Sequence, residues 1–360
     1  KDFSAHYDTD AYRDTIMLDD VLDKLKTLDV YSPKNPFPGL DDQVLITSRN
    51  LKMDVNESAV DWKALGTQPK PEFVINLDET TSRVGVYRQE IMIMEMLNNI
   101  NKDDWKRAIY YATTIGEPPL SLRNHSVLEG IDYRIVPGTP DSTGVNTDIM
   151  FDNLVNKYKW GNIENPKVYL DENNLRMCRS FRVMFSRLIG ALMQKGQTDK
   201  ALIALDRCVE AIPGSTVPRG GESVEYAETY YQLGHPEKAQ KIIDEVLYRV
   251  DGSLQWYASM KAKDMRSCSY DIADNLSALM LVLEVYQQYD KTKYEEFMSK
   301  ITGYTELFLT NGVIFSQSRV HPLDYLMHVA RNSVYLAQND TVERNKEFKK
   351  VEHIAGLMQK

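Results

Sequence analysis

One spacing in the middle of the chain constrains the fold more than any other feature of the sequence. Gly234 and Ala239 stand 38 positions after Gly196 and Ala201, and Glu237-Lys238-Ala239 aligns with Asp199-Lys200-Ala201. Small residues let two antiparallel helices approach closely, and glycine permits the turn that joins them. The spacing therefore predicts two consecutive helical hairpins of the same design.

The two copies resemble the tetratricopeptide (TPR) pattern at several further positions. The spacing is longer than the usual period of about 34 residues, and the loop 214–221, with Pro218 and a Gly-Gly pair, can absorb the difference. Stable stacks need about three repeats or more, so the helices from Tyr270 onward are expected to complete the layer. The matching positions are Leu188, Leu205 and Pro213 in the first copy and Ala227 and Tyr230 in the second.

Helical periodicity continues to the end of the chain. Apolar residues recur every three or four positions, with polar residues between them. This pattern predicts helices over 172–195, 198–212, 222–233, 236–250, 270–290, 293–309, 322–338 and 342–358.

The first third of the chain mixes both periodicities. It predicts a helix over 15–28, one or two strands within 43–55, a strand over 72–77, a helix over 86–100, a buried strand over 108–115 and a strand over 133–136. The predicted fold class is α+β, with a small α/β module over 1–144, a polar-aromatic joint over 145–174 and an all-α TPR-like domain over 175–360.

Composition narrows the classes of partner and compartment. The chain has 43 Lys and Arg against 52 Asp and Glu, which gives a net charge of −9, and this acidic balance disfavours a nucleic-acid partner. The three cysteines are widely spaced and predict no disulfide framework, which leaves the redox compartment open. No run reaches the roughly 20 apolar residues of a membrane span. Because the chain starts at Lys1 rather than at Met, we expect it to be cut from a longer parent protein, and the missing signal-peptide pattern therefore carries little weight.

The chain lacks the common catalytic strings for nucleotide, zinc-protease and serine-hydrolase chemistry. His321, Asp324 and His328 fall on one helix face and could ligate zinc, although Pro322 makes an ordinary helix start the better interpretation. We assign no metal ligand and no cofactor.

Paired carboxylates are a second candidate for chemistry. Asp148 and Asp152 stand one helical turn apart, and Asp171 follows them, so acid–base work is conceivable. Alternatively, Asp148 caps a helix over 149–158 and Asp171 caps the helix that begins at Glu172. We favour the caps and assign no catalytic residue.

Aromatic residues offer a third candidate. Tyr226, Tyr230 and Tyr231 could line the inner groove of the repeat and contact a peptide or sugar, or could pack between helices. The polar-aromatic segment around Trp160 would suit a binding surface or a rigid joint, and we favour the joint. The candidate binding residues are Tyr226, Tyr230, Tyr231, Trp160, Asp148 and Asp152.

Several strings resemble one bacterial family of multispanning membrane proteins. That family is a domain of unknown function related to GT-C-type glycosyltransferases of the protein O-mannosyltransferase kind. The resemblance spans 104–251, and the family more often has Pro where this chain has Ala108. The strings that carry it lie at 104–112, 128–137, 147–154, 159–162, 168–177 and 204–208.

The resemblance implies that membrane helices precede this chain, which would be the extramembrane C-terminal region on the periplasmic side. The catalytic acid of GT-C enzymes lies among the first membrane helices, outside this chain. We therefore expect a non-catalytic region that holds a protein or peptide, including a glycan acceptor, while the parent is a glycosyltransferase candidate. The alternatives are an autonomous TPR-type interaction protein of the cell envelope and a hydrolase that uses Asp148, Asp152 or Asp171.

Overall fold

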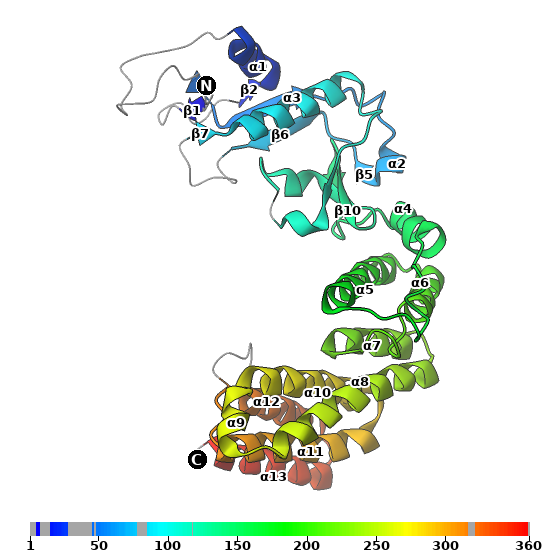
Figure 1. Ribbon diagram of the computed structural model, residues 1–360, viewed down its shortest axis with the longest axis vertical. Coiled ribbons are helices and arrows are strands. Elements are labelled where there is room, and N and C mark those ends of the chain that lie inside the picture. Colours follow the sequence, from blue (N-terminus) through cyan, green and yellow to red (C-terminus); the bar gives the residue numbers. More distant parts are fainter. Residues whose placement is uncertain are drawn as a thin grey trace. The chain divides into compact units, whose positions relative to one another are not determined.

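The computed structural model describes residues 5–7, 15–27, 45–46, 48–77, 85–116, 118–315 and 321–358 (Figure 1). The chain divides into two compact units. We call them the strand unit, Lys1–Tyr158 with Arg187–Ala201, and the helical unit, Lys159–Ser186 with Leu202–Lys360. Every strand among the described residues belongs to the strand unit. The α+β class predicted from the sequence is therefore confirmed.

The strand unit is organised on a sheet with the order β2-β4-β6, formed by β2 (Thr15–Met17), β4 (Asn50–Asp54) and β6 (Glu72–Asn76). β2 and β4 are parallel, whereas β4 and β6 are antiparallel with Leu51 opposite Ile75. Burial alternates along β4 and β6, because successive side chains of a strand point to opposite faces. One face of this sheet is therefore apolar and needs a cover.

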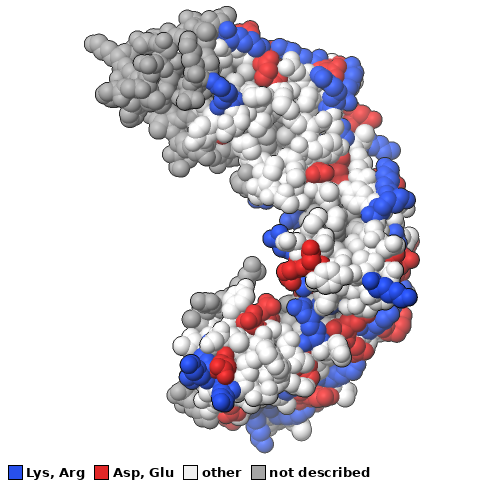
Figure 2. Space-filling model, viewed as in Figure 1, with Lys and Arg blue, Asp and Glu red and all other residues white. Residues whose placement is uncertain are grey.

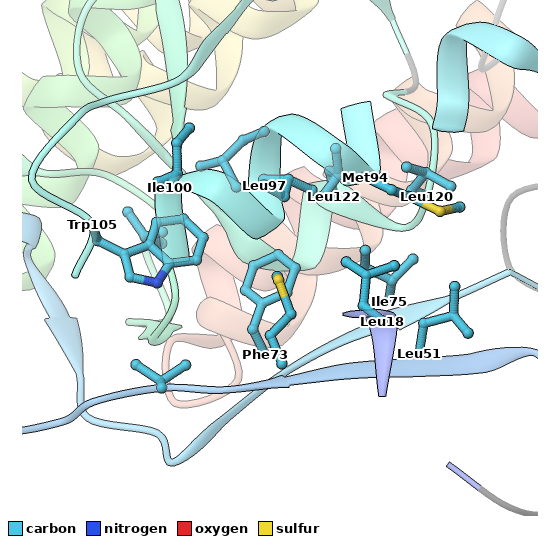
Figure 3. Packing of buried hydrophobic residues seen from close by; sticks show 14 of the residues in the cluster. Leu18, Leu51, Phe73, Ile75, Met94, Leu97, Ile100, Trp105, Leu120 and Leu122 are labelled. Carbon is cyan, nitrogen blue, oxygen red and sulfur yellow. The ribbon is translucent and has the colours of Figure 1, made fainter. Parts of the chain in front are cut away.

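Helix α3 (Arg88–Lys102) supplies that cover. Its buried residues Met94, Leu97 and Ile100 recur at helical spacing, and Figure 3 shows them across from Phe73 and Ile75 of β6. Each such fully buried side chain contributes roughly 1.5–3 kcal/mol. The core of the strand unit also takes residues from α1 (Leu18–Thr27) and from the segment around Trp105, Leu120 and Leu122.

Smaller sheets complete the strand unit. One has the order β8-β10-β9 and is antiparallel, another has the order β3-β1-β7, and β5 pairs with β11. Their strands are β8 (Tyr110–Ala112), β9 (Ser126–Leu128), β10 (Asp132–Ile135), β1 (Ala5–Tyr7), β3 (Leu45–Ile46), β7 (Gly85–Val86), β5 (Thr67–Gln68) and β11 (Thr139–Pro140), with the short helix α2 (Trp62–Leu65) beside them.

Two expectations for this unit need correction. The predicted buried strand over 108–115 is only the three-residue β8, and Tyr110 is 47% exposed. Among the described strands β8 lies at the edge of its sheet and pairs with β10 alone, and the chain then turns into a 3-10 helix, Thr113–Ile115. The predicted helix over 15–28 begins three residues late, because 15–17 pair with β4 as β2. The predicted strands over 72–77 and 133–136 and the helix over 86–100 are confirmed.

All eight helices predicted after residue 172 are present. Helix α8 continues eight residues beyond its predicted end, and the short helix α9 was missed. The bounds are α5 (Glu172–Gln194), α6 (Thr198–Ala211), α7 (Val224–Gln232), α8 (Pro236–Ala258), α9 (Ala262–Ser267), α10 (Ser269–Tyr289), α11 (Lys291–Thr310), α12 (Pro322–Leu336) and α13 (Thr341–Met358).

The repeat appears as two turns of the same geometry. Gly196 and Gly234 both have positive φ, 68° and 79°. In both turns the glycine nitrogen donates to the carbonyl three residues before it, and the next nitrogen donates to the carbonyl five residues before it. This Schellman arrangement ends a helix with glycine in the left-handed region. Ala201 and Ala239 are completely buried, so the predicted helical-repeat character is confirmed.

Arg182 holds the loop that lengthens the first repeat. Its buried guanidinium donates to main-chain carbonyls of the loop, at 3.0 Å to Ile212 and 3.3 Å to Pro218, and also to Val217. A guanidinium has five donors in a fixed fork and so can satisfy several carbonyls at once. The extra residues between the two hairpins are therefore anchored rather than loose.

The later helices extend the stack. α10 packs against α7, α8 and α11, and α12 packs against α10 and α13. Of the described helices, none is both long enough and apolar enough to cross a bilayer. On the face in view, Figure 2 shows acidic and basic side chains interspersed, so the acid surplus does not gather into a single patch there.

Candidate binding sites

The helix after residue 146 starts earlier than predicted. Asn146, not Asp148, is the N-cap of α4 (Thr147–Phe151), because its side-chain oxygen accepts from the Ile149 nitrogen at 3.5 Å. Its amide nitrogen donates to Glu129 at 2.9 Å. Asp148 instead lies in the first turn, and the helix continues as a π-helix, Asp152–Lys157. The cap predicted at Asp171 is confirmed, since Oδ1 accepts from the Asn174 nitrogen at 2.8 Å.

Asp148 and Asp152 each have a lysine partner in the strand unit. Asp148 lies 2.9 Å from Nζ of Lys200, and Asp152 lies 2.6 Å from Nζ of Lys157. These hydrogen bonds from lysine lower the pKa of both carboxyl groups. A general acid needs the opposite shift. The pair is therefore arranged for ionic contacts at the surface.

Tyr226 and Tyr230 are buried within the helical unit, 1% and 2% exposed. The Tyr226 hydroxyl donates to the main-chain oxygen of Arg182 at 2.6 Å and accepts from the Cys208 thiol at 3.5 Å. The Tyr230 hydroxyl donates to Asp206 at 2.7 Å. Burial raises the pKa of both tyrosines. These contacts agree with the alternative interpretation of the sequence, in which the two tyrosines pack between helices.

Tyr231 lies nearer the surface. Its ring stacks on that of Tyr289 in α10, with centroids 4.7 Å apart and planes 6° apart, and both rings are half-buried. Trp160 is buried against Phe181 and Phe185 and so joins the start of the helical unit to α5. Tyr231 is thus the residue of the predicted tyrosine cluster that reaches solvent.

The histidines near residue 321 start a helix. Nδ1 of His321 accepts from the Leu323 nitrogen at 3.2 Å, and Pro322 occupies the first turn of α12. His328 is exposed. Among the described residues, the ligand atoms that come within 4.8 Å of one another belong to a different group, Glu295, Glu343 and Glu347.

Two lysines form ion pairs with that acidic group. Nζ of Lys350 lies 2.7 Å from both Glu295 and Glu347, and Lys346 lies 3.2 Å from Glu295. The group lines a pocket of about 220 Å³. Burial raises the pKa of Glu347, whereas for Glu295 burial is outweighed by the lysine hydrogen bonds, which lower the pKa. The arrangement is an ion-pair network between α11 and α13.

A second pocket, of about 470 Å³, lies within the strand unit. We call it the arginine pocket. It was missed from the sequence, because its walls come from segments that are distant along the chain, 123–145 and the C-terminal half of α5. Its polar side chains are Arg123, Arg187, Ser126, Tyr133, Ser142, Thr143 and Gln194.

The arginine pocket has an ordered wall. Arg187 donates to the Tyr133 hydroxyl, and the Tyr133 ring stacks on Tyr111 with centroids 5.1 Å apart and planes 15° apart. Nε2 of Gln194 donates to Oγ of Ser142 at 3.1 Å. A cavity of this size with a few convergent polar groups is typical of small-molecule sites, which span roughly 300–1,000 Å³.

Comparison with known proteins finds a family whose model matches most of the strand unit. No curated protein and no solved structure matches the chain. A family model matches residues 2–153. This stretch contains the described strands and ends at Asn153, whereas the resemblance inferred from the sequence ran from 104 to 251. Residues 2–153 match the model of TMEM260-associated domain 2, and this part of the chain is therefore similar to a family of unknown function linked to TMEM260.

Proposed function

We propose that this chain is a non-catalytic extramembrane region of a membrane-embedded, glycosyltransferase-like protein, and that its helical unit holds an acceptor polypeptide. The observation that carries the proposal is the match of residues 2–153 to TMEM260-associated domain 2. The helical repeat supports it, because such repeats commonly bind peptides. We place the region on the periplasmic side, as the family resemblance implies.

The exposed aromatic residues of the helical unit favour a protein partner. Tyr248 and Trp256 stand two turns apart on α8 and are 89% and 60% exposed, and Tyr270 in the first turn of α10 is 67% exposed. Tyrosine and tryptophan are enriched at protein interfaces, because they combine large apolar area with a polar group. With the Tyr231–Tyr289 pair they offer anchors for an extended polypeptide.

The carboxylates do not favour the hydrolase alternative. The pKa values of Asp148 and Asp152 are lowered by lysine, and Asp171 is engaged as a helix cap. The autonomous interaction protein remains the stronger rival, since a helical repeat alone would serve it equally well. The sequence upstream of Lys1 separates the two: our proposal requires several membrane spans there, whereas the rival requires a signal peptide alone.

The direct test is sugar transfer to protein in membranes from cells that carry the full-length gene. We expect deletion of residues 202–360, which leaves the strand unit intact, to reduce incorporation of labelled sugar at least tenfold, and the paired change Tyr248→Ala with Trp256→Ala to reduce it severalfold. Tyr169→Ala, at a tyrosine that is 88% exposed outside α8 and α10, is the matched control. Unchanged incorporation after the deletion, or transfer by the isolated chain alone, would contradict the proposal.

A further inference from the structure

We propose that Glu295, Glu343 and Glu347 form a Ca²⁺ site, and that the bound ion fastens α13 to α11. One ligand oxygen from each carboxylate lies within 4.8 Å of the other two. All three residues line the pocket of about 220 Å³ within the helical unit. The inference goes beyond the proposed function, because the exposed aromatic residues of α8 and α10 that would hold a polypeptide lie outside this pocket.

One carboxylate oxygen of Glu347 is buried without compensation. The side chain is 3% exposed, and Oε1 accepts from Nζ of Lys350 at 2.7 Å. Oε2 is buried and has no hydrogen-bond partner in the part of the chain that the structure describes. A buried charged oxygen without a partner is costly, and this cost separates Glu347 from an ordinary acidic residue on the surface. Because Glu347 lines the pocket, a cation bound there supplies the missing partner.

The charge of the group matches a divalent cation. Lys350 is only 19% exposed and lies 2.7 Å from both Glu295 and Glu347, so it is a fixed part of the cluster. Three carboxylates together with this one ammonium group leave two negative charges. Like charges this close repel one another unless a cation lies between them. A single divalent ion removes that repulsion.

Lys346 lies where the ion would bind and can be displaced. Its side chain is 52% exposed and lines the pocket, with Nζ 3.2 Å from Glu295 and 3.9 Å from Glu343. An ion pair that is this exposed contributes little to stability, and the long side chain can turn into water. Lys346 therefore marks a position that attracts a cation, and an ion that binds several carboxylate oxygens at once replaces it.

The donor atoms select the kind of cation. Carboxylate oxygens suit hard ions such as Ca²⁺ and Mg²⁺. Ca²⁺ binds oxygens at about 2.3–2.6 Å, so two of its ligands can lie up to about 5 Å apart, and it accepts irregular geometry. Mg²⁺ requires shorter bonds in a near-ideal octahedron and loses its water reluctantly. Three glutamates on two different helices therefore favour Ca²⁺.

Calorimetric titration of the whole chain with CaCl2 and with MgCl2 tests the inference, after bound metal has been removed with EGTA. The buffer contains about 150 mM NaCl, which screens weak surface attraction. We expect one Ca²⁺ per chain with a Kd on the order of 0.1 mM, and at least tenfold weaker binding of Mg²⁺. Glu343→Gln should weaken Ca²⁺ binding at least tenfold. Lys346→Met removes the competing ammonium group and should strengthen it severalfold.

Two exposed positions on α13 provide matched controls. Glu352→Gln and Lys349→Met make the same changes of charge outside the pocket and should leave Ca²⁺ binding unchanged. Thermal unfolding gives a second measurement, since a ligand of the folded state raises the melting temperature. CaCl2 should raise it for the parent chain and not for Glu343→Gln. Without Ca²⁺ these two proteins should melt together, because the Glu343 side chain is 37% exposed.

Each other result overturns the inference. Failure of Ca²⁺ to bind at millimolar concentration would mean that water or a proton compensates Oε2 of Glu347. Binding that survives Glu343→Gln would place the ion elsewhere, and equal binding of Mg²⁺ would indicate attraction by charge alone. Unchanged or weaker binding in Lys346→Met would show that this lysine does not compete for the position. None of these outcomes depends on sugar transfer by the full-length protein, so the two proposals fail separately.

Discussion

The buried guanidinium of Arg219 donates through Nε to Oε2 of Glu245 on α8. Nη1 and Nη2 of the same arginine are buried without a hydrogen-bond partner, so Glu245 is the carboxylate that compensates this charge. A buried ion whose partner is removed keeps its desolvation cost without the attraction that offset it. The loop before α7 therefore depends on this ion pair.

Replacement of Glu245 by Ala should destabilise the chain by about 3–5 kcal/mol, which is the usual cost of leaving a buried charge unpaired. Arg219→Met should cost less, because it removes the charge itself and leaves Glu245, 29% exposed, in contact with water. Urea unfolding of both variants measures the difference. A larger loss for Arg219→Met would mean that packing of the arginine, rather than its charge, matters at this site.

The Tyr226 hydroxyl gives a second test of stability. Tyr226→Phe keeps the buried ring but removes the bonds to the Arg182 carbonyl and the Cys208 thiol. We expect a loss of about 1 kcal/mol in the free energy of unfolding, the usual contribution of one such hydrogen bond. Tyr248→Phe, at an 89% exposed position, is the matched control and should change little. Equal effects would mean that the hydrogen bonds of the Tyr226 hydroxyl contribute nothing measurable to stability.

The sequence predicts the features that depend on neighbours along the chain. The turns at Gly196 and Gly234 were predictable because a Schellman turn is a local structure with a local glycine requirement. The apolar faces of β6 and α3 were likewise visible as periodicity. The cap predicted at Asp148 is found at Asn146. Such errors at element ends arise because several nearby residues could cap the helix and tertiary contacts decide among them.

The candidate sites depend on contacts that no local pattern reports. Arg123 and Arg187 lie in different elements and line one pocket because the end of α5, residues 187–194, lies beside β10, where Arg187 contacts Tyr133. Tyr289 is likewise absent from the repeat pattern and becomes the partner of Tyr231 through the packing of α10. Tyr226 was predicted either to line the groove of the repeat or to pack between helices, and it lies in the core.

Two glycines, Gly234 in a repeat turn and Gly252 within a helix, should respond to alanine in opposite ways. Gly234 has φ +79°, where an L-residue is strained, so Gly234→Ala should destabilise by roughly 1–2 kcal/mol. Gly252 lies within α8, and a Cβ there meets nothing within 4 Å. Gly252→Ala should therefore stabilise by about 0.5–1 kcal/mol. Thermal unfolding of the two single variants checks the signs, and a shift in the same direction for both would contradict the assigned backbone geometry.

Asp141 predicts a pH dependence in the strand unit. Burial opposes its ionisation, but hydrogen bonds from Lys195 and Thr143 outweigh burial and lower the pKa below the ordinary 3.8. A carboxyl group whose pKa is lowered by folding stabilises the fold at pH values above its unfolded pKa. This contribution is lost as the pH falls through the folded pKa. Asp141→Asn should therefore be less stable than the parent chain at pH 7, and urea titrations should show the gap closing below pH 3.8. Asp274→Asn, an exposed change on α10, controls for loss of one surface charge. A gap that persists unchanged at low pH would mean that Asp141 contributes by its shape rather than by its charge.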